Sequence, residues 1–329
     1  MTVHYRCTIT NTPMTKLMLH FRQKKQSDKM KERLQRIDRG IVLMLAASLT
    51  FAVMGGFAKV LTQQLPAVEV TFFRNIFGVV LIALSIWKVP LKQQGGKPLL
   101  LFFRGAMGFL ALAAYFYIMG KIPLGEAITY NKTSPLFVAF FAWLFLREKL
   151  HPSAIVALIL GFVGIVLIAK PEGGGFDKYD MLGIFSGIGA ALAYTSIREL
   201  RNYYDTRAIV MSFMGVGTLA PLILMLIGSV TNVSGEWDWI IAPFVMPQGW
   251  QWLFIVMVGV SATVSQLLMT KAYEYTKAGI VGTISYTNIL FGVLIGTALG
   301  DPWPDWQTTL GIICIIASGL IVALVKEKA

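Results

Sequence analysis

The sequence contains few of the residues from which soluble redox and catalytic centres are built. Only two cysteines are present, Cys7 and Cys314, so the chain cannot assemble a disulfide framework or a thiolate metal site. The three histidines, His4, His20 and His151, all lie outside the long apolar stretches. A proton relay of histidines buried among those stretches is therefore excluded.

Motifs that supply chemical energy or catalysis are also missing. The chain has no phosphate-binding loop of the G-x-x-x-x-G-K-[ST] form and no H-E-x-x-H zinc motif. It has no pair of buried aspartates, and Ser134 has no buried histidine to activate it. We therefore expect no enzyme activity, no metal and no cofactor, and ATP-driven pumping would need a separate subunit.

Charge is scarce as well, and long apolar stretches take its place. Charged residues make up 14% and hydrophobic residues 56% of the 329 residues, against about 25% charged in a typical soluble domain. An α-helix needs about 20 apolar residues to cross the hydrocarbon core of a bilayer. Ten stretches approach that length: Ile41 to Leu61, Val68 to Trp87, Leu99 to Met119, Leu124 to Leu146, Pro152 to Ala169, Met181 to Leu200, Ala208 to Val230, Gly249 to Ala272, Gly279 to Leu299 and Trp306 to Val325. The pattern predicts an all-α polytopic membrane protein with ten transmembrane helices.

The basic residues alternate from one side of these stretches to the other. With the N-terminus inside, 22 of the 29 lysines and arginines fall on the inner side, including those of a basic tail over residues 1–40. The positive-inside rule then predicts that both termini are cytoplasmic, in the inner (plasma) membrane. The same rule explains the net charge of +12, so we do not expect nucleic acid as a partner.

The second half of the chain repeats part of the first. Residues 124–150 match residues 278–304 at a constant offset of 154, which aligns Thr129 with Thr283 and Phe137 with Phe291. Five spans per half force the second half to lie upside down relative to the first. We therefore predict two inverted five-helix repeats, over residues 41–171 and 180–326, a design that supports alternating access.

Small residues recur at a spacing of four, which is typical of closely packed helices. One set is Gly183 and Gly187, and the other is Gly292, Gly296 and Gly300. We expect these glycines to mark helix contacts and to say nothing about a ligand.

Several short motifs together resemble a known family. In chain order they are Lys59, Arg74, the run 113–117 (AAYFY), the run 134–137 (SPLF), the run 146–150 (LREKL) and the run 161–165 (GFVGI). In their order and spacing they resemble the EamA-type members of the drug/metabolite transporter superfamily. The resemblance implies a ten-helix transporter of small organic solutes. The chain departs from the family pattern at Ile289, which replaces the proline of the second half, and at Asn131 and Lys132.

Four cations fall within the predicted spans, and each costs about 2.5 to 3.5 kcal/mol at the bilayer centre. They are Lys59, Arg74, Arg104 and Lys132. Lys59 and Arg104 lie near helix ends, where long side chains can reach the headgroups. Arg74 is about two turns in, and Lys132 lies about 12 Å below the outer end of its helix. Lys132 is therefore the cation that most needs an explanation.

Pro135 gives the surroundings of Lys132 a polar character. A proline has no N–H for the carbonyl four residues earlier, which belongs to Asn131, so the helix is expected to kink there. Tyr130 and Asn131 add further polar groups. Two roles are open: Lys132 pairs with a carboxylate such as Glu126 to hold helices together, or it binds solute or couples its transport.

These observations define a predicted site and function. The candidate substrate-binding or coupling residues are Lys132, Arg74, Glu126, Asn131, Tyr130, Pro135 and Lys59. The cations favour a secondary transporter, exporting or exchanging amino acids or related carboxylate-bearing metabolites. A nucleotide-sugar or other anionic metabolite exchanger is the alternative, and a channel or scaffold is the alternative of another class. The expected partners are a small-molecule solute, the bilayer, a proton or counter-solute, and a second copy of the chain.

Overall fold

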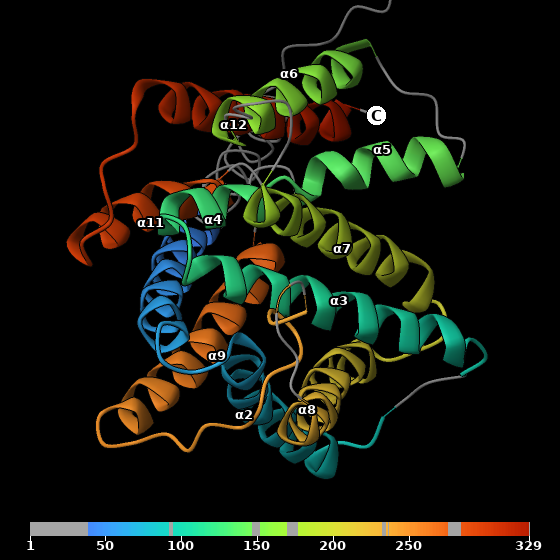
Figure 1. Ribbon diagram of the computed structural model, residues 1–329. Helices are drawn as coiled ribbons and strands as arrows, with labels where there is room; N and C mark the ends of the chain where they lie inside the picture. Colours follow the sequence, from blue (N-terminus) through green and yellow to red (C-terminus); the bar gives the residue numbers. More distant parts are fainter. Residues whose placement is uncertain are drawn as a thin grey trace, which may run out of the picture.

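The fold is a bundle of helices, seen in a computed structural model that describes residues 39–91, 95–146, 152–169, 177–231, 235, 237–275 and 284–328 (Figure 1). Most of the predicted tail, residues 1–40, lies outside this range. A first helix spans Arg39–Thr62. The labelled helices follow: α2 (Ala67–Lys88), α3 (Pro98–Met119), α4 (Leu124–Asn131), α5 (Ser134–Leu146), α6 (Pro152–Ala169), α7 (Lys178–Leu200), α8 (Thr206–Val230), α9 (Gln251–Tyr275), α11 (Thr287–Ala298) and α12 (Trp306–Lys328).

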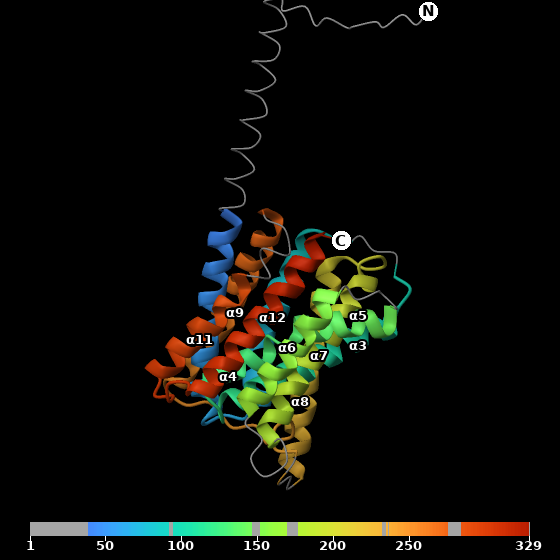
Figure 2. The ribbon, with the colours of Figure 1, turned by 90° about the horizontal axis from the view of Figure 1, so that it is seen from above.

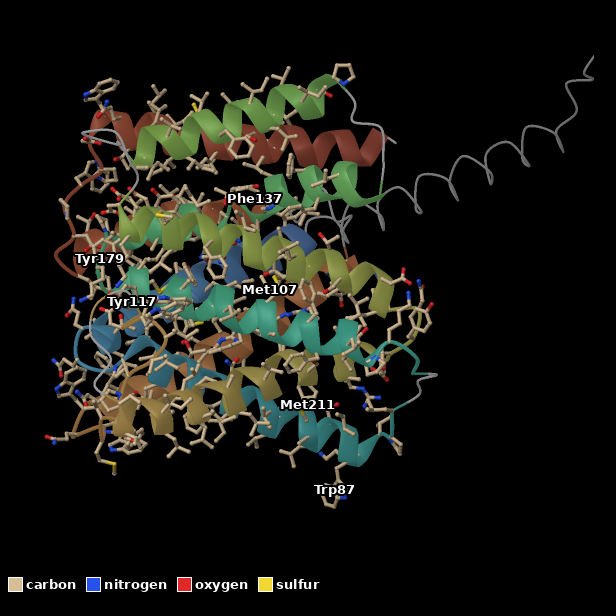
Figure 3. All side chains as sticks on the ribbon, turned by 45° about the vertical axis from the view of Figure 1, so that its right-hand side comes forward. Trp87, Met107, Tyr117, Phe137, Tyr179 and Met211 are labelled. Carbon is tan, nitrogen blue, oxygen red and sulfur yellow. The ribbon has the colours of Figure 1, made fainter. Side chains whose placement is uncertain are left out.

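Six of the described helices are long and apolar enough to cross a membrane, and three shorter apolar helices accompany them. The six contain residues 39–62, 67–88, 98–119, 178–197, 206–230 and 251–269. Many large apolar side chains on these helices are exposed, Trp87 among them (Figure 3). A hydrophobic exterior of this kind fits a lipid surrounding. The chain is a multi-pass membrane protein.

Local sequence explains where several helices begin. Prolines stand directly before or at the first residue of α2, α3 and α4, where their missing N–H costs nothing. Asp177 caps α7 by accepting a hydrogen bond from the backbone N–H of Asp180, and the Asp180 side chain returns the contact. Asp205 caps α8 in a similar way, through the backbone N–H of Arg207.

Helices from the two halves of the chain lie against one another. In Figures 1 and 2, α6 runs beside α12, and α4 lies beside α11. In the lower half of Figure 1, α3 lies between α7 and α8, and α2 contacts α8 and α9. The largest contacts therefore join helices that are far apart in the sequence.

Glycines allow the closest of these contacts. A methyl group added at Gly164 of α6 would lie 2.8 Å from the carbonyl oxygen of Gly311 in α12, and the reverse distance is the same. Between α4 and α11, Gly292 faces Ile128, and Gly296 faces Leu124. The packing role predicted for these two glycines is confirmed. Gly300 differs, because it has φ 98° and open space around it, so it allows a left-handed turn after α11.

The fourth predicted span is not one continuous helix. It divides into α4 and α5, with Lys132 and Thr133 between them. In the second half, a break also occurs at Tyr286, just before α11. Tyr286 lies 154 residues after Lys132, so the two breaks stand at matching positions of the repeat. The second break has no proline behind it, because Ile289 replaces Pro135.

Candidate functional site

The break between α4 and α5 is held by hydrogen bonds to α7. The Tyr130 hydroxyl, on a fully buried side chain, donates to Asp180 Oδ1 at 2.6 Å. Six residues further along α7, Asn131 Nδ2 donates to Ser186 Oγ at 3.0 Å. The Thr133 hydroxyl closes the break by donating to the carbonyl oxygen of Tyr130 at 2.6 Å.

Two glycines of α7 let this break approach closely. A methyl group on Gly183 would lie 2.6 Å from the Tyr130 ring, and one on Gly187 would meet Thr133 Oγ1. The predicted packing role of this glycine pair is confirmed. The glycines of α7 therefore fix where the polar segment of the fourth span lies.

Lys132 occupies the break without a balancing charge. Its backbone N–H still donates to the carbonyl oxygen of Ile128. Within the described ranges, the Lys132 side chain forms no ion pair or hydrogen bond. Glu126 has other interactions, including an electrostatic one with Tyr130. Pro135 is the second residue of α5, where a helix accepts proline. The geometry thus does not show the pairing of Lys132 with a carboxylate, and its role in binding or coupling stays a prediction.

Arg74 lies in a different group of side chains. Its Nη1 donates to Asn75 Oδ1 at 2.8 Å, and Asn75 Nδ2 donates to the carbonyl oxygen of Gly217 in α8 at 3.0 Å. The Arg74 guanidinium lies 5.6 Å from the centre of the Phe213 ring, and the Arg104 guanidinium lies 4.9 Å from the same ring. Sequence reasoning placed Arg104 among the snorkelling residues and did not identify Phe213.

Lys59 is part of a buried network that ties the two halves together. Its Nζ lies 2.7 Å from Asp301 Oδ1 and donates to the carbonyl oxygen of Ile122 at 2.9 Å. The other oxygen of Asp301 accepts from the backbone N–H of Leu124 at 2.8 Å, at the N-terminus of α4. The charge of Lys59 is therefore balanced. This arrangement favours a positioning role over direct contact with solute.

A second polar cluster lies at the end of α3 where Tyr117 and Tyr179 approach each other, as labelled in Figure 3. The Tyr117 hydroxyl donates to Asp238 Oδ2 at 2.8 Å, and Lys178 forms an ion pair with Asp238 Oδ1. Burial alone raises the pKa of Asp238, but the bonds from Lys178 and Tyr117 outweigh it, so the pKa lies below the usual value. The long connection after α8 is thereby fixed to α3 and α7.

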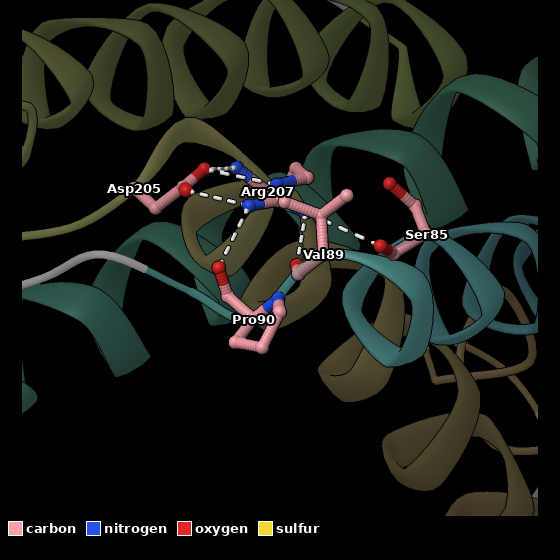
Figure 4. Close-up of polar contacts among 5 residues, drawn as sticks. All are labelled: Ser85, Val89, Pro90, Asp205 and Arg207. Atoms are coloured by element: carbon pink, nitrogen blue, oxygen red, sulfur yellow. Dashed lines mark hydrogen bonds and ion pairs between the residues drawn. The ribbon is translucent and has the colours of Figure 1, made fainter.

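The opposite ends of the helices carry their own polar contacts. Arg207 donates to the carbonyl oxygens of Val89 and Ser85 at 2.7 and 3.3 Å, and it pairs with Asp205 at 2.9 Å (Figure 4). These bonds join the end of α2 to the start of α8. Near the start of α3, Lys97 pairs with Glu199 at 2.6 Å, and this bond raises the pKa of Lys97.

A metal centre finds no support in the described ranges, where no three His, Cys, Asp or Glu side chains come together. The structure does reveal residues that the sequence did not single out: Asn75, Asp180, Phe213 and Asp301. Asp180, Phe213 and Asp301 each contact a candidate residue more than 40 positions away, and Asn75 joins its neighbour Arg74 to the distant Gly217. No local pattern signals these distant contacts.

These features define a helical membrane protein in which two related halves pack together. The model of the EamA-like transporter family matches residues 38–170 and again residues 177–324. The chain therefore belongs to the EamA-like transporter family and is a transporter rather than an enzyme.

Curated relatives agree with this assignment. An "Uncharacterized transporter" of Helicobacter pylori strain 26695 is 33% identical over 87% of this chain and 94% of its own length. The pseudopaline exporter CntI of Pseudomonas aeruginosa PAO1 is 32% identical over 88% of this chain and 97% of its own. A solved crystal structure with 17% identity has a TM-score of 0.53 over 91% of this chain and 98% of its own, which supports the fold alone.

Proposed function

We propose that this chain is a secondary active transporter that exports or exchanges small organic solutes by alternating access. Amino acids or related carboxylate-bearing metabolites are the proposed solutes, with a proton or counter-solute supplying the driving force. The proposal rests mainly on Lys132, a cation at the break between α4 and α5 in a molecule of two related halves. Lys132 forms no ion pair with the described residues. The relative that exports pseudopaline supports the outward direction.

We also propose the finer topology: ten spans in two inverted repeats, with both termini in the cytoplasm. The contacts support it, because each joins residues that the charge pattern places on one side. Lys97 and Glu199 are both expected inside, and Lys178 and Asp238 are both expected outside. In addition, α6 packs against α12, which begins 154 residues later, the same offset as the sequence repeat. A two-fold axis between the halves produces such self-pairing.

Counterflow into proteoliposomes tests the proposal. Vesicles loaded with an unlabelled mixture of amino acids and carboxylates should accumulate the labelled solute that they exchange. Lys132→Ala should abolish exchange while the protein still inserts and elutes as a single species. Lys88→Ala, at an exposed end of α2, removes a similar charge and should leave exchange intact. Unchanged exchange kinetics in Lys132→Ala would contradict the role of Lys132.

Two other functions remain as outcomes of the same experiment. If nucleotide sugars or other anionic metabolites exchange and amino acids do not, the chain is an anionic metabolite exchanger. If the vesicles pass ionic current without saturable exchange, it is a channel.

A further inference from the structure

A second cationic site lies between α2, α3 and α8, apart from Lys132. Arg74 comes from α2 and Arg104 from α3, and both guanidinium groups lie near the ring of Phe213 in α8. Arg104 is 7% exposed, so this charge is almost entirely withdrawn from solvent. The two arginines therefore form one cluster around Phe213.

Neither arginine has a carboxylate partner among the residues that the structure describes. No ion pair includes Arg74 or Arg104, and the Nε atom of each is buried with no hydrogen-bond partner. Arg74 donates one hydrogen bond to Asn75. The remaining N–H groups of the two guanidiniums have no acceptor among the described residues. Arg104 is buried and Arg74 is half-buried, and such charges without a counter-charge are costly in a membrane protein.

The ring of Phe213 lies beside both guanidinium groups and is no oxyanion acceptor for their donors. A guanidinium that interacts with an aromatic face keeps its N–H groups in its own plane, directed away from the ring. Those N–H groups match the oxygens of a carboxylate or phosphate, which they bind in pairs. The cluster therefore offers strong donors that lack an acceptor.

The surrounding helices pack closely around Arg104 and Phe213. A methyl group added at Gly108 would lie 2.5 Å from Arg104 Nη1 and 2.7 Å from the Phe213 ring, so these side chains would have to move. Tyr194 of α7 lies near both arginines, and its side chain is 54% exposed. The surface of the helix bundle therefore lies close to the two arginines at Tyr194.

Sequence positions place Arg104 and Tyr194 toward the end of the bundle where α3 begins. Arg104 lies six residues after Pro98, and Tyr194 lies six residues before the end of α7 at Leu200. At 1.5 Å per residue, each is about 9 Å from the same end of the bundle. The pair Lys97 and Glu199 joins those two helix ends. In the proposed topology this is the cytoplasmic end.

We infer that Arg74 and Arg104, beside Phe213, form a binding site for a solute that carries two negative oxyanion charges. This inference rests on the proposed transport function and narrows its substrate class to dianions. Dicarboxylates and phosphate share the required chemistry. The inference also separates this site from Lys132, whose side chain makes none of these contacts.

Thermal melting of the purified full-length protein in detergent tests the site without transport. Succinate and inorganic phosphate are the dianionic probes, acetate is the monoanionic probe, and sodium chloride matches the ionic strength. Succinate or phosphate should raise the melting temperature far more than acetate or chloride, because ligand binding stabilises the folded state. The probe that gives the larger shift distinguishes a dicarboxylate from a phosphate site.

Substitutions identify the residues responsible. Arg104→Gln and Arg74→Gln should each weaken the affinity for the effective dianion by about tenfold or more, because each removes charge-assisted hydrogen bonds. Gly108→Ala should weaken it as well, since the added methyl group displaces the Arg104 side chain. Lys88→Gln, which removes an exposed charge from α2, should leave the affinity unchanged. Arg104→Lys keeps the charge and serves as a second variant if Arg104→Gln does not fold.

The outcomes separate this inference from the proposed function. If neither dianion shifts the melting temperature, or if the arginine variants keep wild-type affinity, the two-arginine site is wrong even where exchange of another solute is found. If the dianion binds through both arginines but no solute exchanges across proteoliposomes, the site stands and the transport proposal fails.

Discussion

At the scale of single residues, the buried pair of Lys59 and Asp301 matters most for stability. Both side chains are mostly withdrawn from solvent, with 7% and 13% exposed. Removing one partner of such a pair leaves an uncompensated buried charge, at a cost of about 3 to 5 kcal/mol. We therefore expect Lys59→Met or Asp301→Asn to lower the melting temperature clearly, and the double variant to recover part of the loss.

The control for this prediction is the exposed pair of Lys97 and Glu199. Lys97→Met should change the melting temperature little, because water screens exposed pairs. Equal losses at the two pairs would show that burial does not decide the effect.

Asp238 provides a prediction about pH. Its pKa is held below the usual 3.8, mainly by Lys178 and Tyr117 against the opposing effect of burial. A group with a lowered folded-state pKa stabilises the fold above its unfolded pKa and loses that contribution as the pH falls through the folded pKa. The stability contributed by Asp238 should therefore disappear below about pH 4.

The measurement compares melting temperatures at pH 5 and pH 3. The wild-type protein should lose more stability over this interval than Asp238→Asn does. An identical loss in both proteins would show that Asp238 does not contribute to the acid sensitivity.

At the scale of helices, the contact of α7 with the break between α4 and α5 can be tested at one glycine. Gly187 faces Thr133 and lies 3.0 Å, measured to an added methyl group, from the Tyr130 carbonyl oxygen. Gly187→Ala should destabilise the protein by about 1 to 3 kcal/mol, since overpacking moves the neighbouring helix. Gly215→Ala is the matched control, because an added methyl group there meets no atom within 4 Å. The two melting temperatures should differ clearly, and a Gly187→Ala protein as stable as Gly215→Ala would contradict the packing argument.

Helix boundaries were predictable from the sequence because they depend on local chemistry. Pro66 and Pro123 mark the starts of α2 and α4, where the predicted spans begin at Val68 and Leu124. The break at Lys132 followed from Pro135, although the sequence indicated a kink and the structure divides the helix. The matching break at Tyr286 has no such signal, because Ile289 stands where the first half has Pro135.

The partners of the site residues were not predictable in the same way. Hydropathy places Lys59 near a helix end, but its partner Asp301 lies in the other repeat. Likewise, Arg74 and Arg104 lie at different depths when counted along their helices, and only the packing of α8 brings Phe213 to both. Such contacts depend on the arrangement of whole helices, which a local pattern does not encode.

At the scale of the whole molecule, the proposed sidedness follows from charge and can be measured directly. Trp237 lies in the connection after α8 and is exposed, and Lys88 is exposed at the end of α2. The positive-inside rule places Trp237 outside and Lys88 in the cytoplasm. In a background with Cys7→Ser and Cys314→Ala, the variants Trp237→Cys and Lys88→Cys each carry a single thiol.

A membrane-impermeant maleimide then reports the side of each thiol. Trp237→Cys should react in right-side-out vesicles, and Lys88→Cys should react only in inverted vesicles or after permeabilisation. The reversed pattern would invert the proposed orientation, and reaction of both thiols from one side would contradict the number of crossings between them. Because α3 begins and α7 ends on the side of Lys88, the same result decides whether Tyr194 and Arg104 lie toward the cytoplasm. An exporter collects its solute from the cytoplasm, so a position of the arginine cluster toward that side would fit export.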